Sequence, residues 1–179
     1  ERLLRLGCQA VNISFIADTN AEKIIAALKA RQPILALVDS IQTMYSSQVP
    51  AEPGSISQIR ACTVNFLELA KTTGLPVILV GHITKDGQIA GPKSLEHIVD
   101  TVIYLESDPA RDFRILRATK NRFGSVNEIG IFEMTGTGFR EVKNPAGIFI
   151  ESGRENISGS AISAVMEGTR PFLVEVQAL

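Results

Sequence analysis

Two short runs of purely apolar residues constrain the fold of this chain more than any other feature. Residues 34–38 and 77–80 contain no polar side chain, which is typical of parallel strands that are buried on both faces of a sheet. Between them, residues 55–73 have apolar residues at helical spacing, with Ser55 placed as an N-cap and Gly74 at the C-terminal end. Parallel neighbours need such a crossover, so this order predicts an α/β fold with a mainly parallel sheet flanked by helices. The apolar side of the helix is expected to carry Ile56, Ile59, Thr63, Phe66, Leu67 and Ala70.

Further elements extend this pattern in both directions. A helix is expected to begin at the N-cap segment 18–20 and to end before Pro33. Its apolar face would be formed by Ala21, Ile24, Ile25 and Leu28. We also expect a helix tail at residues 3–6, a short helix at 93–98, and strands at residues 11–16, 101–105, 113–118, 126–132 and 138–142.

The composition changes after Asn144 and Pro145. Short strand-like runs follow at residues 147–151, 159–167 and 172–179, separated by polar turns. We therefore predict two domains: an α/β domain over residues 1–143, and the start of a β-rich second domain over residues 144–179.

Composition excludes several classes of protein. The net charge of −1 gives no global basic field, so any contact with nucleic acid must come from local patches. Cys8 and Cys62 lack the spacing of a metal site, which favours a reduced, cytoplasmic compartment. No apolar run is long enough to cross a membrane, and residues 1–5 do not resemble a signal peptide. The chain has no initiating Met and stops inside an apolar run, so we expect a fragment.

Three polar residues lie within two positions of the ends of the two apolar runs. Asp39 has the position of a Walker B acid, whose carboxylate holds Mg²⁺, usually through water, against nucleotide phosphates. Ser40 and His82 also lie at strand carboxyl ends, where ligands bind in parallel sheets. The alternatives are that Asp39 only starts a turn and that His82 is a neutral, hydrogen-bonded side chain.

A basic pair, Lys120 and Arg122, lies between the strands expected at residues 113–118 and 126–132. Two cations two residues apart at a strand end project to the same side of a sheet. Gly124 follows, which places the pair at a turn on the rim. The planar fork of Arg and the point charge of Lys suit phosphate oxygens. A solvated hairpin tip is the alternative.

Two segments, residues 45–57 and 84–87, are long enough to be mobile binding loops. Lys85 and Arg60 are candidates for contact with a nucleic-acid backbone, with ordinary surface charge as the alternative. The chain contains no G-x-x-x-x-G-K-[ST] phosphate loop and no Cys/His zinc set. It can therefore supply residues that contact Mg²⁺ and the transition state, but not the loop that binds the nucleotide phosphates.

Together these residues resemble the bacterial RadA (Sms) family of recombination ATPases. The resemblance rests on LALVDSIQ at residues 35–42, PGS at 53–55, VGHITKDG at 80–87, AGPK at 90–93, LEH at 95–97 and KNRFG at 120–124. The last string is highly specific for the family. GTRP at residues 168–171 and LVEVQAL at 173–179 are similar to the opening of the family's Lon-protease-like domain.

The resemblance implies a RecA-like, DnaB-related homo-hexameric helicase motor that uses ATP and Mg²⁺. Such a motor moves along single-stranded DNA and extends recombination intermediates by branch migration in DNA repair, in partnership with the recombinase RecA. By this resemblance Asp39 is the Walker B acid, Ser40 its neighbour, and His82 reports the state of the γ-phosphate to the DNA-facing loops. Lys120 and Arg122 would act in trans on the ATP of the neighbouring subunit.

The resemblance also implies that residues 43–57 and 83–92 face a central channel, with Lys85 as the preferred DNA contact. The family's N-terminal zinc finger, phosphate loop and catalytic glutamate do not occur in this chain, so we expect no ATP hydrolysis by the chain alone. Two alternatives stay open: an assembly or interaction module, and a RecA-like ATPase that acts on protein. A protease function of the Lon-like part would need a Ser–Lys pair that this sequence does not supply; in this family that domain is regarded as a scaffold.

Overall fold

The computed structural model describes Gly7 and residues 12–82, 95–107, 113–143, 159–167 and 170–178. The helix tail expected at residues 3–6, the strand at 147–151 and most of the helix at 93–98 lie outside the described residues. The chain divides into two units, one spanning Asn12–Asp100 and the other including Thr101–Leu179.

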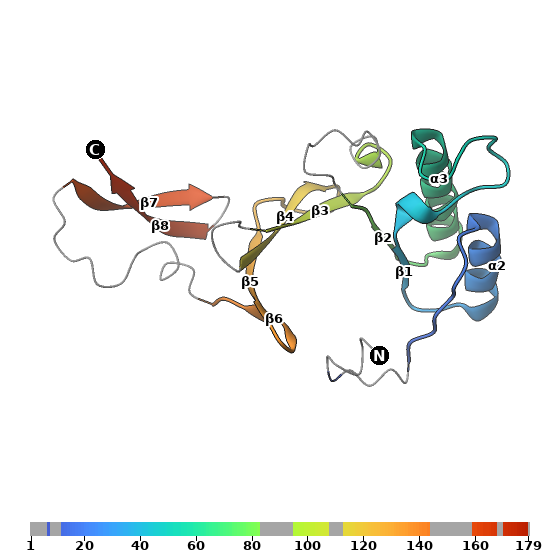
Figure 1. Cartoon of the computed structure of the whole chain (residues 1–179), viewed down its shortest axis with the longest axis horizontal. Coiled ribbons are helices and arrows are strands. Elements are labelled where there is room, and N and C mark those ends of the chain that lie inside the picture. The colour runs from blue at the N-terminus through green and yellow to red at the C-terminus, as the bar shows by residue number, and fades with distance from the viewer. Residues whose placement is uncertain are drawn as a thin grey trace. The chain divides into compact units, whose positions relative to one another are not determined.

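The first unit is an α/β arrangement built on one pair of parallel strands (Figure 1). Strands β1 (Ala36–Asp39) and β2 (Val77–Val80) pair along their whole lengths. The helix α3 (Ile56–Thr73) connects them, and α2 (Ala21–Arg31) precedes β1. A single 3₁₀ turn, η1 (Ile41–Thr43), follows β1 immediately. The predicted strand–helix–strand order is therefore present.

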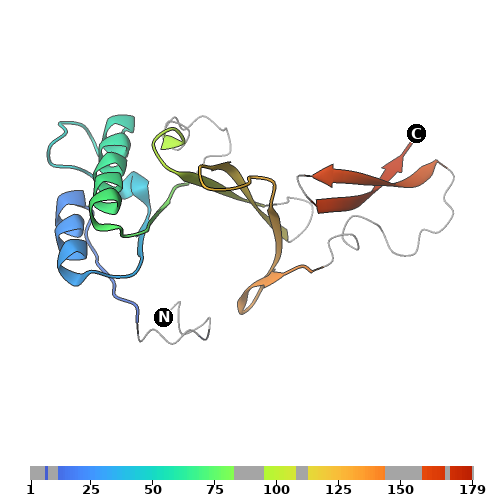
Figure 2. The same cartoon turned by 180° about the vertical axis from the view of Figure 1, so that it is seen from behind.

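The hydrophobic core of this unit lies between the helices and one face of the strand pair. Helices α2 and α3 lie on the same side of β1 and β2 in both views (Figures 1 and 2). Phe66 is only 1% exposed, and burying such a side chain contributes roughly 1.5–3 kcal/mol. The core contains Ala21, Ile24, Leu28, Ala36, Val38, Ile41, Ile59, Cys62, Phe66 and Leu69.

Both predicted helix caps are present. The side chain of Asn20 accepts a hydrogen bond from the backbone N–H of Lys23, and Ser55 accepts one from Gln58. Gly74 ends α3 with φ of 72°, the left-handed conformation that glycine adopts without strain. One detail of the predicted apolar side is wrong. Ile56 is 48% exposed because it lies at the first position of α3, outside the contact with the core.

The prediction that residues 34–38 are buried on both sheet faces is wrong. Burial alternates along β1, and Leu37 is 61% exposed, because the described helices cover only one face of the strand pair. The strand expected at residues 11–16 is also wrong for its described part, in which residues 12–16 have no strand pairing.

The second unit contains a four-stranded antiparallel sheet. Its strands follow one another in the order β3 (Thr101–Ser107), β4 (Phe113–Asn121), β5 (Ile129–Thr135) and β6 (Gly138–Glu141). The prediction of a mainly parallel sheet is thus wrong for the described strands. Strands β1 and β2 pair in parallel, whereas β3, β4, β5 and β6 form an antiparallel sheet. The short connections between β3, β4, β5 and β6 explain this, because a parallel neighbour would need a crossover of a dozen or more residues.

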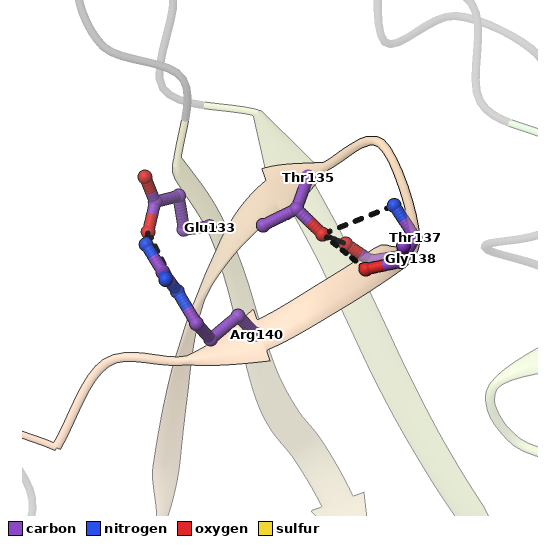
Figure 3. A network of polar contacts seen from close by, with 5 residues as sticks. All are labelled: Glu133, Thr135, Thr137, Gly138 and Arg140. Carbon is purple, nitrogen blue, oxygen red and sulfur yellow. Dashed lines mark hydrogen bonds and ion pairs between the residues drawn. The ribbon is translucent and has the colours of Figure 1, made fainter.

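Side chains fasten the hairpin of β5 and β6 at its turn (Figure 3). Glu133 lies opposite Arg140, whose Nη2 is 2.5 Å from the Glu133 carboxylate. Thr135 Oγ1 donates to the carbonyl of Gly138 at 2.7 Å and accepts from the backbone N–H of Thr137 at 3.3 Å. Opposite charges directly across a ladder stabilise it by roughly 0.2–1 kcal/mol, so this cluster has a structural role.

The expected strands near the C-terminal end form a separate antiparallel hairpin, β7 (Ser160–Glu167) with β8 (Arg170–Gln177). Gly159 precedes it with φ of 87°, and a Cβ there would lie 2.9 Å from the carbonyl oxygen of Ala178. Glycine is therefore required at the base of this hairpin. The assignment of residues 144–179 to a Lon-like domain stays a prediction.

Candidate nucleotide site

The carboxyl ends of β1 and β2 bring two of the predicted site residues together. Asp39 pairs with Val80 at the last position of the parallel ladder. His82 Nε2 lies 3.7 Å from Asp39 Oδ1, and these side chains are 73% and 62% exposed, respectively. Ser40 is buried, with a relative exposure of 7%, and its peptide bond to Asp39 is cis. The site thus offers one accessible carboxylate beside one accessible imidazole.

Asp39 fits a magnesium ion that is held mainly by water and phosphate. Mg²⁺ usually keeps several water ligands and takes only one or two protein carboxylates when it accompanies a nucleotide. No group of three or more His, Cys, Asp or Glu side chains within the described ranges could hold a metal by itself. The exposed Asp39 carboxylate at the sheet edge supplies the one oxygen ligand or water acceptor that such an ion needs.

A residue that the sequence did not single out joins this site. Gln42 Nε2 donates a hydrogen bond of 2.9 Å to the main-chain carbonyl of His82. Gln42 belongs to η1, directly after Asp39 and Ser40, so it links the ends of the two parallel strands. Gln42 is one of several polar residues in this strand-to-loop transition, beside Ser40 and Thr43, so the sequence gives no signal that identifies such a contact.

A buried glutamine anchors the loop that follows η1, which the sequence predicted to be long enough to be mobile. Gln58 is 2% exposed, and its Oε1 accepts from the backbone N–H of Ser46 at 2.8 Å. Its Nε2 donates to the carbonyls of Ser46, Val49 and Ala51 at 3.2, 2.8 and 2.9 Å. The side chain of Gln58 thus bonds to backbone N–H and C=O groups of the loop that have no neighbouring strand to pair with.

Helix α2 holds the same loop from the other side. The Ser46 hydroxyl donates to Glu22 Oε1 at 2.5 Å, and Asn20 Nδ2 donates to Ser47 Oγ at 2.8 Å. Desolvation acts to raise the pKa of Glu22, but hydrogen bonds from the Ser46 hydroxyl and from backbone N–H groups leave that pKa below its ordinary value. Glu22 therefore stays ionised as part of this network.

The basic pair lies in the second unit, at the end of β4. Lys120 is within the strand, half-buried and paired with Val102, whereas Arg122 is exposed just beyond it. The hairpin between β4 and β5 is as expected, but the strand extends through Lys120 rather than ending at residue 118. A register shift beside Val102 leaves Thr119 without a partner in the ladder, and such a bulge re-aims the residues that follow it.

Asn121 organises the turn that carries Arg122, which sequence reasoning missed. Its Oδ1 accepts from the backbone N–H of Phe123 at 3.1 Å, and its Nδ2 donates to the carbonyl of Ser125 at 3.4 Å. A Cβ on Gly124 would lie 3.1 Å from Asn121 Nδ2. Asn commonly bonds the backbone two residues on, so the Asn-Arg-Phe-Gly order was the available signal.

The candidate DNA contacts are less defined. Arg60 is exposed on α3, whereas Lys85 and residues 83–92 lie outside the described residues.

Cys62 is buried without a disulfide, and desolvation together with the charge of Glu22 raises its pKa to about 11. The thiol thus stays protonated and is not a nucleophile. In the part of the chain that the structure describes, no helix is long and apolar enough to cross a membrane.

Comparison with curated proteins gives matches along nearly the whole chain. "DNA repair protein RadA" of Bacillus subtilis (strain 168) is 52% identical over 175 residues, which cover 98% of this chain and 38% of that protein. The proteins of the same name from Salmonella typhimurium and Escherichia coli (strain K12) are each 47% identical over 178 residues, covering 99% of this chain and 39% of theirs. The chain thus spans about two fifths of the length of these relatives. No protein-family model matches it.

Comparison with solved structures supports the fold. The crystal structure of the RadB recombinase aligns with a TM-score of 0.50 and 21% identity, covering 69% of this chain and 59% of that one. At this identity the likeness concerns the fold alone. It confirms the α/β, recombinase-like part of the predicted fold.

Proposed function

The chain is homologous to a segment of the bacterial RadA proteins along nearly its whole length, and from this premise we propose that it is part of a DNA-dependent ATPase. The parent protein would be a cytoplasmic helicase motor that acts on single-stranded DNA and on recombination intermediates in DNA repair. The observation that carries this proposal is the placement of Asp39 and His82 within 3.7 Å of each other, beyond the ends of two parallel strands. Open α/β sheets bind their ligands at such an edge.

Asp39 is the residue that would hold magnesium in this proposal. Its exposed carboxylate can bind the ion directly or accept hydrogen bonds from the water ligands of the ion. When bound with ATP, magnesium supplies positive charge that neutralises the phosphate oxygens. The chain supplies one of the ligands, and residues of the parent protein that form a phosphate loop would supply the rest.

His82 would sense the nucleotide by exchanging partners. A separation of 3.7 Å from Asp39 is too long for a hydrogen bond, so the imidazole is not committed to the carboxylate. A phosphate oxygen near the Asp39 site would compete for the same Nε2. A shift of His82 between these partners would move the residues that follow it, which are the proposed DNA-facing residues 83–92.

Lys120 and Arg122 would act on the ATP of a neighbouring subunit in a homo-hexamer. Arg122 is exposed on a turn that the side chain of Asn121 fastens, so the backbone position of Arg122 is defined. A rigidly presented Arg fork can bind two phosphate oxygens at once. Charge placed against the transferring phosphate in this way typically accelerates phosphoryl transfer by ~10³–10⁵-fold.

DNA contacts are proposed for residues 43–57, Arg60 and Lys85. The first of these segments is tied to α3 by Gln58 and to α2 by Glu22. A backbone held in this way can present amide groups to DNA phosphates without a large ordering cost. Partnership with the recombinase RecA, and a scaffold role for a Lon-like domain that begins near residue 144, are further parts of this proposal.

ATP hydrolysis by the full-length protein, measured with and without single-stranded DNA, tests the proposal. We expect turnover that DNA stimulates and that falls when Arg122→Ala subunits are mixed in, because each site would need a residue of its neighbour. Turnover that ignores DNA would instead favour a RecA-like ATPase that acts on protein.

A second candidate is an assembly or interaction module. Self-association of the isolated chain without nucleotide, together with no nucleotide binding by the full-length protein, would support that function.

A further inference from the structure

His82 lies beyond the hydrogen-bond ladder that joins β1 to β2. The ladder ends at the pair of Asp39 and Val80, two residues before His82. Past that point, the bond from Gln42 Nε2 to the His82 carbonyl, at 2.9 Å, fastens the main chain of His82 to the β1 side of the site. The two residues are 40 positions apart in the sequence.

The side chains of Asp39 and His82 cannot fix this geometry themselves. Their nearest atoms are 3.7 Å apart, and both side chains are mostly exposed. Exposed ion pairs are screened by water and contribute little to stability. The position of the imidazole therefore depends on where the backbone of His82 is held.

Gln42 itself is held firmly by its neighbours in η1. Ile41 is 1% exposed in the core, and the carbonyl of Ser40 accepts hydrogen bonds from Thr43 N at 3.2 Å and Thr43 Oγ1 at 2.8 Å. A Cβ on Gly54 would lie 3.5 Å from the carbonyl oxygen of Gln42, so the far end of the anchored loop also packs here. Gln42 thus contacts the loop on one side and the end of β2 on the other.

The amide of Gln42 is a poor choice for stability alone. Its Oε1 is buried and has no hydrogen-bond partner among the residues that the structure describes. Turning the amide over would place that oxygen against the carbonyl oxygen of His82, so the carbonyl fixes the orientation. A buried acceptor without a partner destabilises a fold, and an apolar side chain of the same length would avoid that cost.

We infer that Gln42 is a positioning residue that sets the imidazole of His82 relative to Asp39 and joins this sensor to the loop of residues 43–54. The inference rests on the proposed function, because it names the element through which His82 would couple nucleotide to DNA. Gln42 acts through its Nε2–H donor to the main chain of His82, and it need not touch nucleotide or DNA.

Gln42→Met in the full-length protein tests the inference, because Met has the same length and no donor. We expect the melting temperature to be unchanged or higher. The ratio of DNA-stimulated to DNA-free ATP turnover should fall by about tenfold, which corresponds to the free energy of one hydrogen bond. Gln177→Met makes the same chemical change at an exposed position of β8 and should leave that ratio unaltered.

Gln42→Glu adds a readout that a purely structural role would not produce. The ionised carboxylate has no donor, but the protonated acid can donate to the His82 carbonyl. Relative to wild type at the same pH, stimulation in Gln42→Glu should recover as the pH is lowered. Stimulation that is normal in Gln42→Met, or that falls only in step with its melting temperature, would overturn the inference.

A direct measurement separates this inference from the proposed function. Three-bond NMR couplings of His82 report whether its side chain keeps one rotamer, and we expect averaging in Gln42→Met but not in Gln177→Met. If wild type shows no DNA stimulation, the proposed function fails, and the couplings alone then decide whether Gln42 positions His82. Unchanged couplings would overturn the role of Gln42 even in a DNA-stimulated enzyme.

Discussion

The side-chain amide of Gln58 makes a two-way hydrogen bond with the backbone of Ser46, accepting from its N–H at 2.8 Å and donating to its carbonyl at 3.2 Å. Two more carbonyls, those of Val49 and Ala51, accept from the same amide. This side chain of α3 therefore anchors a segment that, from its length, was expected to be able to move. Any contact between this segment and DNA would therefore be transmitted to α3 through Gln58.

Gln58→Leu should destabilise the first unit by about 3 kcal/mol, because several buried backbone groups of the loop lose their partner. Urea unfolding measures this difference. Gln48→Leu, at an exposed position of the same loop, is the matched control and should change the unfolding free energy by less than about 0.5 kcal/mol. Equal stabilities of Gln58→Leu and wild type would mean that the amide network does not hold the loop.

The lowered pKa of Glu22 predicts a pH-dependent contribution to stability. A group whose pKa is lower in the folded state stabilises the protein fully above its ordinary value, here 4.5. That stabilisation is lost as the pH falls through the lowered folded pKa. The difference in unfolding free energy between wild type and Glu22→Gln should therefore be largest near pH 7 and shrink in acid.

Unfolding at pH 7 and at pH 3 checks this prediction for Glu22. Glu68→Gln removes one negative charge from an exposed position of α3 and controls for net charge. A difference between wild type and Glu22→Gln that is the same at both pH values would show that the hydrogen bond from Ser46 does not depend on the carboxylate charge.

Local chemistry made part of this fold predictable. The caps at Ser55 and Gly74 depend on neighbouring backbone groups within one helix turn, so the sequence alone was enough to place them. The Asp39 position followed from the same kind of local pattern, an apolar run with an acid at its end.

Other features depend on which elements lie opposite one another, and the sequence does not encode that locally. Leu37 is exposed because no described layer covers its face, although its neighbours are as apolar as those of a fully buried strand. The β3–β4 pairing is antiparallel because of the short connection after Ser107. The contacts of Gln42 and Gln58 join residues far apart in sequence, which no periodicity reveals.

Gly124→Ala should impair the proposed action of Arg122. The new Cβ would lie 3.1 Å from Asn121 Nδ2, so the amide that fastens the turn must shift. We expect ATP turnover of the full-length protein to fall several-fold while its melting temperature changes little, because the turn is exposed. Gly136→Ala is the matched control, since a Cβ there has nothing within 4 Å. If both substitutions lowered ATP turnover equally, the geometry of this turn would not be needed for the proposed action of Arg122.

Lys120→Ala and Arg122→Ala should each abolish ATP turnover by the full-length protein while leaving nucleotide binding largely intact. The reason is that these cations are proposed to bind the phosphate of a neighbouring subunit, where such contacts are worth ~10³–10⁵-fold in rate. Arg117→Ala removes a cation of β4 that pairs with Glu106 at 2.9 Å, and it should retain turnover. Normal turnover in either Lys120→Ala or Arg122→Ala would exclude that residue from the reaction.

Lys85→Ala should weaken binding of single-stranded DNA and lower its salt dependence. Each cation that neutralises a phosphate releases about 0.7 counterion from a single strand, so the slope of log K against log salt should become shallower by that amount. Lys29→Ala, at an exposed position in the last turn of α2, controls for loss of one positive charge. Binding isotherms at several salt concentrations separate the two effects. Parallel slopes for Lys85→Ala, Lys29→Ala and wild type would show that Lys85 contacts solvent rather than the phosphate backbone, and Arg60 would then be the first residue to test.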